Sequence, residues 1–265
     1  MPGVASRLCI VFALLAVVPA SSVKAAEATI GVAANFTHAA KRLAQAFEAE
    51  TGHRLVLSFG STGQLFTQIT YGAPYDVLLA ADTARPKRIV AEGLGVPETR
   101  FTYATGILVL WSADPNLIDG TPSVLARPTL GHIAIANPVT APYGAAAIET
   151  MKALGLYQSL RKHLVQGKSV GQAYQFVSTR NAPLGFVALS QIQQNDKGSR
   201  WIVPKEMHDP LRQDAVLLEH GRNNKAAKAF LEFLKGRKAV KMIKAVSYTH
   251  LRAHETYEGI ADAGF

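Results

Sequence analysis

The sequence predicts an α/β protein with two lobes, each containing a mainly parallel sheet flanked by helices. Short apolar stretches alternate along the chain with longer segments in which apolar residues recur three and four positions apart. The first pattern is typical of buried strands and the second of amphipathic helices, and their alternation favours parallel sheets. The chain has 265 residues, of which 48% are hydrophobic and 18% charged, enough apolar material for one large or two small packed domains.

The first lobe is expected over residues 27–105, with the C-terminal residues 221–265 returning to it. Its predicted strands are short and apolar: 29–34, 54–59 and 76–80. A helix follows each strand. The first starts at Asn35, a residue type favoured at helix N-caps, and stops at Gly52. The second runs to about Tyr71, and the third begins near Thr83.

The second lobe is expected over residues 106–220. Its predicted strands are 106–111, 132–136, 184–189 and 215–218. One helix follows the loop 137–144 and ends at Leu154, and another runs from about Ser169 to Arg180. A single amphipathic helix from Asn223 to about Ala245 is expected to close the chain.

Residues 1–25 have the organisation of a secretory signal peptide. Arg7 precedes an almost unbroken apolar run from Leu8 to Ala20, and small residues follow near Ala25. The run is shorter than the roughly 20 apolar residues that a membrane-spanning helix needs. The chain's one cysteine, Cys9, lies within this segment, so the mature protein can form no disulfide. We therefore expect an exported, soluble protein.

The formal net charge of +9 suits an anionic ligand or surface. Much of it lies in one late helical stretch, which we interpret as a solvated helix face: Arg222, Lys225, Lys228, Lys235, Arg237, Lys238, Lys241 and Lys244. Export and the lack of a nucleic-acid-binding motif argue against a nucleic-acid partner.

Motifs for catalysis and for metal binding are absent from the sequence. The turn Gly60-Ser61-Thr62-Gly63 is neither a Gly-x-Ser-x-Gly nucleophile elbow nor a phosphate-binding loop. No His-Glu-x-x-His or cysteine pair marks a metal site. We expect no enzymatic activity, no cofactor and no protein-coordinated cation. The alternative from another class is an exported hydrolase with Ser61 as its nucleophile.

A small or polar turn leads into an expected helix at four places, two in each lobe: Asn35-Phe36, Ser61-Thr62, Tyr143-Gly144 and Ser169-Val170. Helix N-termini leave backbone N–H groups unpaired and carry partial positive charge, so they bind anions without a charged side chain. Any one of these turns could simply cap its helix. Together they predict an oxyanion site between the lobes.

Several motifs resemble the periplasmic molybdate-binding proteins of ABC importers, over essentially the whole mature length. The matching stretches are 33–36 (AANF), 58–63 (SFGSTG), 72–77 (GAPYDV) with 81–82 (AD), 137–138 (NP), 141–144 (APYG), 181–185 (NAPLG) and 226–236 (AAKAFLEFLKG). The resemblance implies a class II periplasmic binding protein fold and a periplasmic location. It also implies molybdate or tungstate as the ligand, a membrane permease as the partner and, we expect, a monomer.

Carried over position by position, the resemblance implies five oxyanion-binding residues: Asn35, Ser61, Thr62, Tyr143 and Val170. Thr62 matches the register better than Ser61, and Tyr143 and Val170 fall at backbone-amide positions. Many family members place a tyrosine hydroxyl where this chain has Ala188. The Tyr143 hydroxyl is a candidate to replace that donor.

Two further alternatives stay open at this point. The ligand could be sulfate, thiosulfate, phosphate or ferric ion, although ferric ion would need a cluster of tyrosines and only Tyr143 is well placed. In the tail, residues 246–256 (VSYTHLRAHET) interrupt the closing helix and are interpreted as a non-native insertion. His250 and His254, four residues apart there, are the alternative metal-binding interpretation.

Overall fold

The computed structural model describes residues 25–127, 131–193 and 197–246. The predicted signal peptide lies outside these residues except for Ala25. The predicted insertion lies outside them except for Val246, so the proposed pair His250 and His254 is outside as well.

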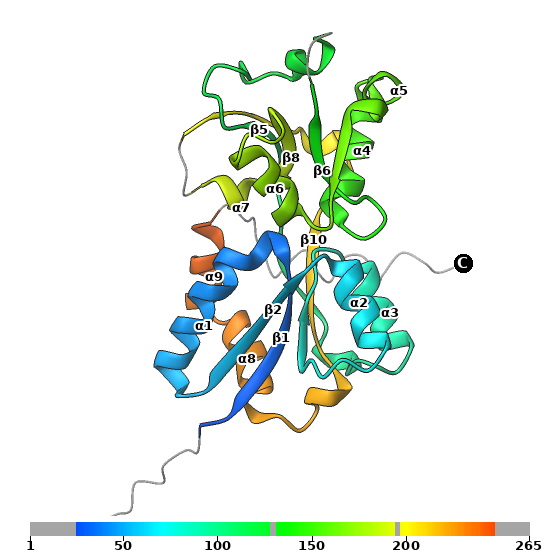
Figure 1. Cartoon of the computed structure of the whole chain (residues 1–265). Coiled ribbons are helices and arrows are strands. Elements are labelled where there is room, and N and C mark those ends of the chain that lie inside the picture. The colour runs from blue at the N-terminus through cyan, green and yellow to red at the C-terminus, as the bar shows by residue number, and fades with distance from the viewer. Residues whose placement is uncertain (1–24, 128–130, 194–196, 247–265) are drawn as a thin grey trace, which may run out of the picture.

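The predicted two-lobed α/β architecture is confirmed, and each lobe is built on a five-stranded sheet (Figure 1). The first sheet has the order β2-β1-β3-β10-β4. Its strands are β1 (Glu27–Ala33), β2 (Arg54–Gly60), β3 (Val77–Leu79), β4 (Phe101–Thr105) and β10 (Arg212–Leu217). β1 pairs in parallel with β2 and β3, whereas β10 is antiparallel to both β3 and β4.

The second sheet repeats this arrangement in the order β7-β6-β8-β5-β9. Its strands are β5 (Leu108–Ser112), β6 (Ile133–Ala136), β7 (Leu164–Gly167), β8 (Leu184–Ala188) and β9 (Ser199–Ile202). β6 is parallel to β7 and β8, and β5 is antiparallel to β8 and β9. Both sheets are therefore mixed, and the expectation of mainly parallel sheets holds for only half of the strand pairs.

Helices cover both faces of the first sheet (Figure 1). One face packs against α1 (Thr37–Thr51), α8 (Lys225–Lys235) and α9 (Arg237–Lys244), and the other against α2 (Thr62–Thr70) and α3 (Ala84–Ala91). Apolar residues at helical spacing explain this packing, because Leu43 and Phe47 of α1 are buried against Phe230 of α8.

The second lobe is likewise layered, with α4 and α6 supplying separate clusters of buried side chains. Its helices are α4 (Pro142–Ala153), α5 (Tyr157–Leu160), α6 (Val170–Ser178) and α7 (Leu189–Ile192). Short 3-10 turns complete the described elements: η1 (Ala34–Phe36), η2 (Pro97–Thr99), η3 (Pro122–Ala126), η4 (Arg161–His163), η5 (Lys205–Met207) and η6 (Glu219–Gly221).

Two predictions about the elements are wrong, and several elements were missed. The closing helix is two helices, because Gly236 adopts an extended conformation between α8 and α9. β10, assigned to the second lobe, lies inside the first sheet, so the chain returns there before Arg212 rather than at residue 221. β4, β7, β9 and α5 were not predicted, since their short segments carry few apolar residues or mix them with polar ones.

Two segments join the lobes, from β4 to β5 and from β9 to β10. They run side by side where the backbone N–H of Gly106 donates to the carbonyl of Leu211 at 2.9 Å. Gly106 also lies against Tyr143 of the second lobe, so the connection is at the interface between the lobes, where a hinge can act. In residues 25–127, 131–193 and 197–246, no helix has the length and apolar content needed to cross a bilayer.

Candidate functional site

The five residues predicted to bind the oxyanion line a single small cavity between the lobes. Its wall consists of Ala33, Ala34, Asn35, Ser61, Thr62, Ala81, Ala141, Pro142, Tyr143 and Val170. The cavity is small, with a volume of about 10 Å³, close to the space that a single water molecule needs. Pockets for drug-sized molecules are much larger, roughly 300–1,000 Å³, so the size of this cavity favours a ligand of a few atoms.

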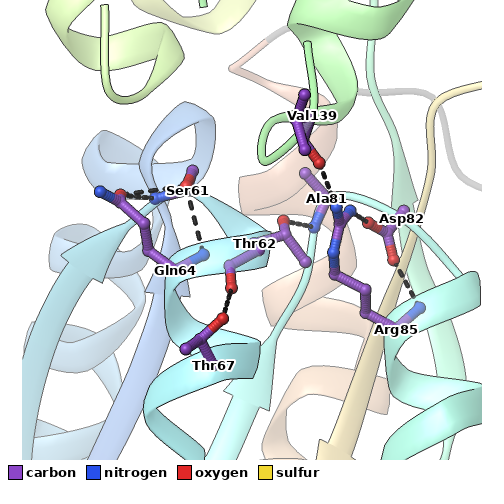
Figure 2. A network of polar contacts seen from close by, with 9 residues as sticks. Ser61, Thr62, Gln64, Thr67, Ala81, Asp82, Arg85 and Val139 are labelled. Atoms are coloured by element: carbon purple, nitrogen blue, oxygen red, sulfur yellow. Dashed lines mark hydrogen bonds and ion pairs between the residues drawn. The ribbon is translucent and has the colours of Figure 1, made fainter. Parts of the chain in front are cut away.

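The start of α2 contributes Ser61 and Thr62 to this wall (Figure 2). Ser61 is the N-cap: its hydroxyl accepts from the backbone N–H of Gln64, while the Gln64 side chain accepts from the Ser61 backbone. The Ser61 hydroxyl also donates to Gln64 Oε1 at 3.0 Å. Its side chain is therefore engaged in capping.

Thr62 is fully buried, and its hydroxyl oxygen accepts from the backbone N–H of Ala81 at 2.9 Å (Figure 2). Ala81 follows β3, so this bond fixes the Thr62 side chain to the end of a central strand. Because the oxygen is the acceptor, the hydroxyl hydrogen points away from Ala81 and can be donated elsewhere.

The start of α6 contributes Val170, with Ser169 as N-cap; the Ser169 hydroxyl accepts from the backbone N–H of Gln172 at 3.4 Å. Val170 and Thr62 are the first residues of their helices, a position whose N–H has no intrahelical acceptor. Within the described part of the chain, neither N–H donates to a protein acceptor. Two backbone donors from opposite lobes thus belong to the cavity wall.

The expectation that Asn35 is an N-cap is wrong. The chain first makes the 3-10 turn η1, so α1 begins two residues later at Thr37, and its N-cap Phe36 makes no side-chain cap. The Asn35 side chain is instead buried, and its Nδ2 donates to Oε1 of Gln213 at 2.9 Å. It lines the cavity as predicted, but as an amide held by β10.

Tyr143, one residue after the start of α4, is 1% exposed and lines the cavity from the second lobe. Its hydroxyl oxygen accepts from Nε2 of Gln213 at 3.4 Å. Ala188 ends β8, and its backbone N–H donates to Gln191 Oε1. Whether Tyr143 supplies the donor missing at Ala188 stays a prediction.

Gln213 is the residue near the site that sequence reasoning missed. It is fully buried and contacts both Asn35 and Tyr143. A glutamine followed by an acid at the head of the apolar run of β10 was the available signal, because a buried amide needs hydrogen-bonding partners.

Among the described residues, no charged side chain lines the cavity. Its polar groups are hydroxyls, one side-chain amide and helix N-terminal backbone amides, all neutral donors oriented with the positive ends of helix dipoles. Neutral donors of this kind stabilise a negatively charged ligand. Among the residues that the structure describes, no three His, Cys, Asp or Glu side chains gather as metal ligands would.

Besides the bond from Gln213 to Tyr143, further hydrogen bonds join the lobes around the cavity. The backbone N–H of Gly63 donates to the carbonyl of Thr140 at 2.8 Å, and the Arg85 guanidinium donates to the carbonyl of Val139, also at 2.8 Å (Figure 2 shows the second). On another side, the Ser190 hydroxyl donates to the carbonyl of Asn35 at 3.0 Å. These contacts describe a closed arrangement of the lobes.

The geometry argues against two of the alternatives. Ferric ion is poorly matched, because in the part of the chain that the structure describes Tyr143 is the one tyrosine in the wall and no carboxylate accompanies it. A hydrolase is poorly matched as well: the Ser61 hydroxyl bonds to Gln64, and no histidine or carboxylate of the described segments lines the cavity to activate it.

The bacterial extracellular solute-binding protein family matches residues 28–247. The molybdate-binding protein ModA of Rhodobacter capsulatus is 52% identical over 224 residues, 84% of this chain and 88% of that protein. The molybdate-binding protein ModA of Azotobacter vinelandii is 50% identical over 246 residues, 92% of this chain and 97% of that protein.

Solved structures agree with these relatives. The periplasmic molybdate-binding protein of Azotobacter vinelandii superimposes with a TM-score of 0.82 at 41% identity, covering 85% of this chain and all of that one. The sulfate-binding protein SubI of Mycobacterium tuberculosis, at 13% identity and a TM-score of 0.72, covering 86% of this chain and 88% of that one, shares the fold. The resemblance predicted from the motifs is confirmed: the chain belongs to the bacterial extracellular solute-binding protein family.

Proposed function

We propose that the chain captures molybdate, or the nearly isosteric tungstate, in the cavity between its lobes and delivers it to the membrane permease of an ABC importer. The observation that carries this proposal is the cavity itself, which is small and which the described residues line with neutral donors from both lobes and with no charged side chain. The ModA relatives at 50% and 52% identity support the choice of oxyanion.

Hydrogen bonds alone are expected to hold the ligand. The backbone N–H groups of Thr62 and Val170 and the side chains of Asn35, Thr62 and Tyr143 are the proposed donors, with Ser61 contributing if its hydroxyl turns from Gln64. Donors spaced for a larger tetrahedral ion reach a smaller one poorly, so sulfate is discriminated against by size. Release needs no strong ion pair to be broken, which suits a carrier.

Several further properties belong to the same proposal. Export through the N-terminal segment 1–25 would place the protein in the periplasm, where its permease can meet it. The chain would act as a monomer, because both walls of the cavity come from one chain. It would need no cofactor, and it would bind its ligand without transforming it.

A thermal-shift panel tests the proposal. A ligand that binds the native state alone stabilises it by RT ln(1 + [L]/Kd), so molybdate and tungstate should raise the melting temperature by several degrees. Sulfate, thiosulfate and phosphate at the same concentration should leave it nearly unchanged. A shift with phosphate or sulfate and none with molybdate would assign the cavity to a different oxyanion.

A further inference from the structure

We propose that Gln213 is a positioning residue of the anion site, one that orients the donors of Asn35 and Tyr143 without itself lining the cavity. The inference rests on the proposed function. Gln213 lies on β10 of the first lobe, is fully buried, and reaches a cavity residue in each lobe. It lies outside the sequence motifs described above.

The direction of each hydrogen bond explains what Gln213 does. Its Oε1 accepts from Asn35 Nδ2 at 2.9 Å, and this contact sets the orientation of the Asn35 amide by holding its nitrogen end. Its Nε2 donates to the Tyr143 hydroxyl oxygen at 3.4 Å. Since that oxygen is the acceptor, the phenol's own hydrogen is directed away from Gln213. The Gln213 amide thereby orients the donor of Asn35 on one wall of the cavity and the donor of Tyr143 on the other.

An irregularity between β4 and β10 holds Gln213 in this position. Gln213 pairs with Ala104 and Asp214 with Thr102, so Tyr103 is an extra residue on β4. The Thr102 hydroxyl donates to Asp214 at 2.7 Å, and the Tyr103 hydroxyl is 3.0 Å from Oε1 of Gln213. Bulges of this kind re-aim side chains beside functional sites. Here the bulge places Tyr103 against the amide.

Gly106 completes the arrangement at the connection between the lobes. A Cβ at this position would overlap the Tyr143 hydroxyl oxygen and lie 2.7 Å from Gln213 Nε2. Glycine therefore makes room for the point where the amide of one lobe meets the phenol of the other. The hydrogen bond from Gln213 to Tyr143 joins the two lobes. Gln213 therefore also links the orientation of the donors to the closed arrangement of the lobes.

Double-mutant cycles measured by calorimetry with molybdate test the proposal. Gln213→Met keeps the side-chain length and removes both hydrogen-bonding functions, and we expect it to weaken binding about tenfold, within the range of coupled contacts. In a Tyr143→Phe or an Asn35→Ala background, the factor by which the same substitution weakens molybdate binding should be at least about threefold smaller. If the role of Gln213 were merely structural, its substitution would weaken molybdate binding by the same factor in every background.

Thr102→Val is the matched control. It removes a hydrogen bond from the same strand pair, on the face that carries Asp214, and should lower thermal stability while leaving molybdate affinity unchanged. If Gln213→Met does not fold, Gln213→Glu replaces it in the cycles. The carboxylate keeps acceptors for Asn35 and Tyr103 but cannot donate to Tyr143, so its loss of affinity should be smaller in the Tyr143→Phe background.

Equal losses in all backgrounds, or parental affinity for the Gln213 variant, would overturn the positioning role while leaving the proposed function intact. A parent protein that binds sulfate or phosphate in place of molybdate overturns the choice of ligand, and the cycles are then run with that anion. A parent that binds no oxyanion overturns both proposals.

Discussion

Gly63 and Thr140 meet across the cleft so closely that no side chain fits between them. The Gly63 N–H donates to the Thr140 carbonyl at 2.8 Å, and a Cβ on Gly63 would lie 2.8 Å from Thr140 Cα and 2.9 Å from its carbonyl oxygen. Real Cβ atoms do not approach backbone that closely. The closed arrangement therefore requires glycine at the second position of α2, whereas separated lobes do not.

We expect Gly63→Ala to weaken molybdate binding at least tenfold by obstructing closure, since each 1.4 kcal/mol corresponds to a factor of ten. Stability without ligand should be unchanged or slightly higher, because alanine in a helix is favoured over glycine by about 0.5–1 kcal/mol. Calorimetry and thermal unfolding separate the two effects.

Gly171→Ala is the control for Gly63→Ala. Gly171 is also the second residue of its helix and also faces the other lobe, but its Cβ would lie 3.5 Å from Ala34 Cβ, an ordinary contact. This variant should bind as the parent does. If the two alanine variants bind equally well, closure does not depend on the Gly63 contact.

Substitutions of Thr62 separate its hydroxyl from its backbone. Thr62→Ser keeps the acceptor for Ala81 and the donor for the ligand, so we expect nearly parental binding. Thr62→Val keeps the shape, removes the donor and leaves the Ala81 N–H unpaired. It should lose about 1.5–3 kcal/mol of binding and about 1–3 kcal/mol of stability. Parental affinity for the valine variant would exclude the Thr62 hydroxyl from the site.

Substitutions of Asn35 test the sign of the ligand's charge. Asn35→Ala should weaken oxyanion binding by about 1.5–3 kcal/mol through loss of a donor. Asn35→Asp, nearly the same shape, should weaken it more, because it replaces a donor by an acceptor and adds a negative charge. Calorimetry of both variants with molybdate gives the comparison. Tighter ligand binding by the aspartate variant would indicate a cationic ligand.

Binding should change little between pH 7 and pH 8. Within residues 25–127, 131–193 and 197–246, no His, Asp, Glu, Lys or Arg lines the cavity. On the neighbouring helix α1, burial lowers the pKa of His38 from its ordinary value, and Arg42 and Lys41 lower this pKa further, which favours the neutral form of His38. A tenfold change in molybdate affinity with a histidine-like midpoint would reveal a titrating ligand group.

The same pKa shift gives a prediction for stability. Because the pKa of His38 is lower in the folded protein, the unfolded chain binds more protons as the pH falls below about 6.5. The free energy of unfolding should therefore decline from that pH downward, and His38→Gln should remove that part of the decline. Unfolding by urea at pH 7 and at lower pH measures it; equal declines in parent and variant would contradict the assignment to His38.

Local chemistry determined which parts of the site could be predicted from sequence. The starts of α2 and α6 were predicted correctly, because Ser61 and Ser169 cap them through neighbouring residues alone. Asn35 was misjudged as a cap, since nothing in its neighbours indicates that the helix is preceded by a 3-10 turn. Its partner Gln213 lies 178 residues away, and only the pairing of β10 inside the first sheet brings them together.

The same distinction between local and non-local signals applies to the fold. Strands followed by helices were recognised from periodicity, whereas β4, β7 and β9 were missed because strand pairing, rather than apolar content, defines them. Insertion of β10 between β3 and β4 also makes the first sheet mixed. Such non-local pairings carry no short-range pattern.

Calorimetric titration of the purified mature chain with molybdate tests the central claim most directly. The cavity between the lobes predicts one molybdate per chain, with sulfate giving no comparable heat at the same concentration. Sulfate or phosphate binding as tightly as molybdate, or a stoichiometry other than one, would contradict capture of a single large oxyanion by the donors of Asn35, Thr62, Tyr143 and Val170.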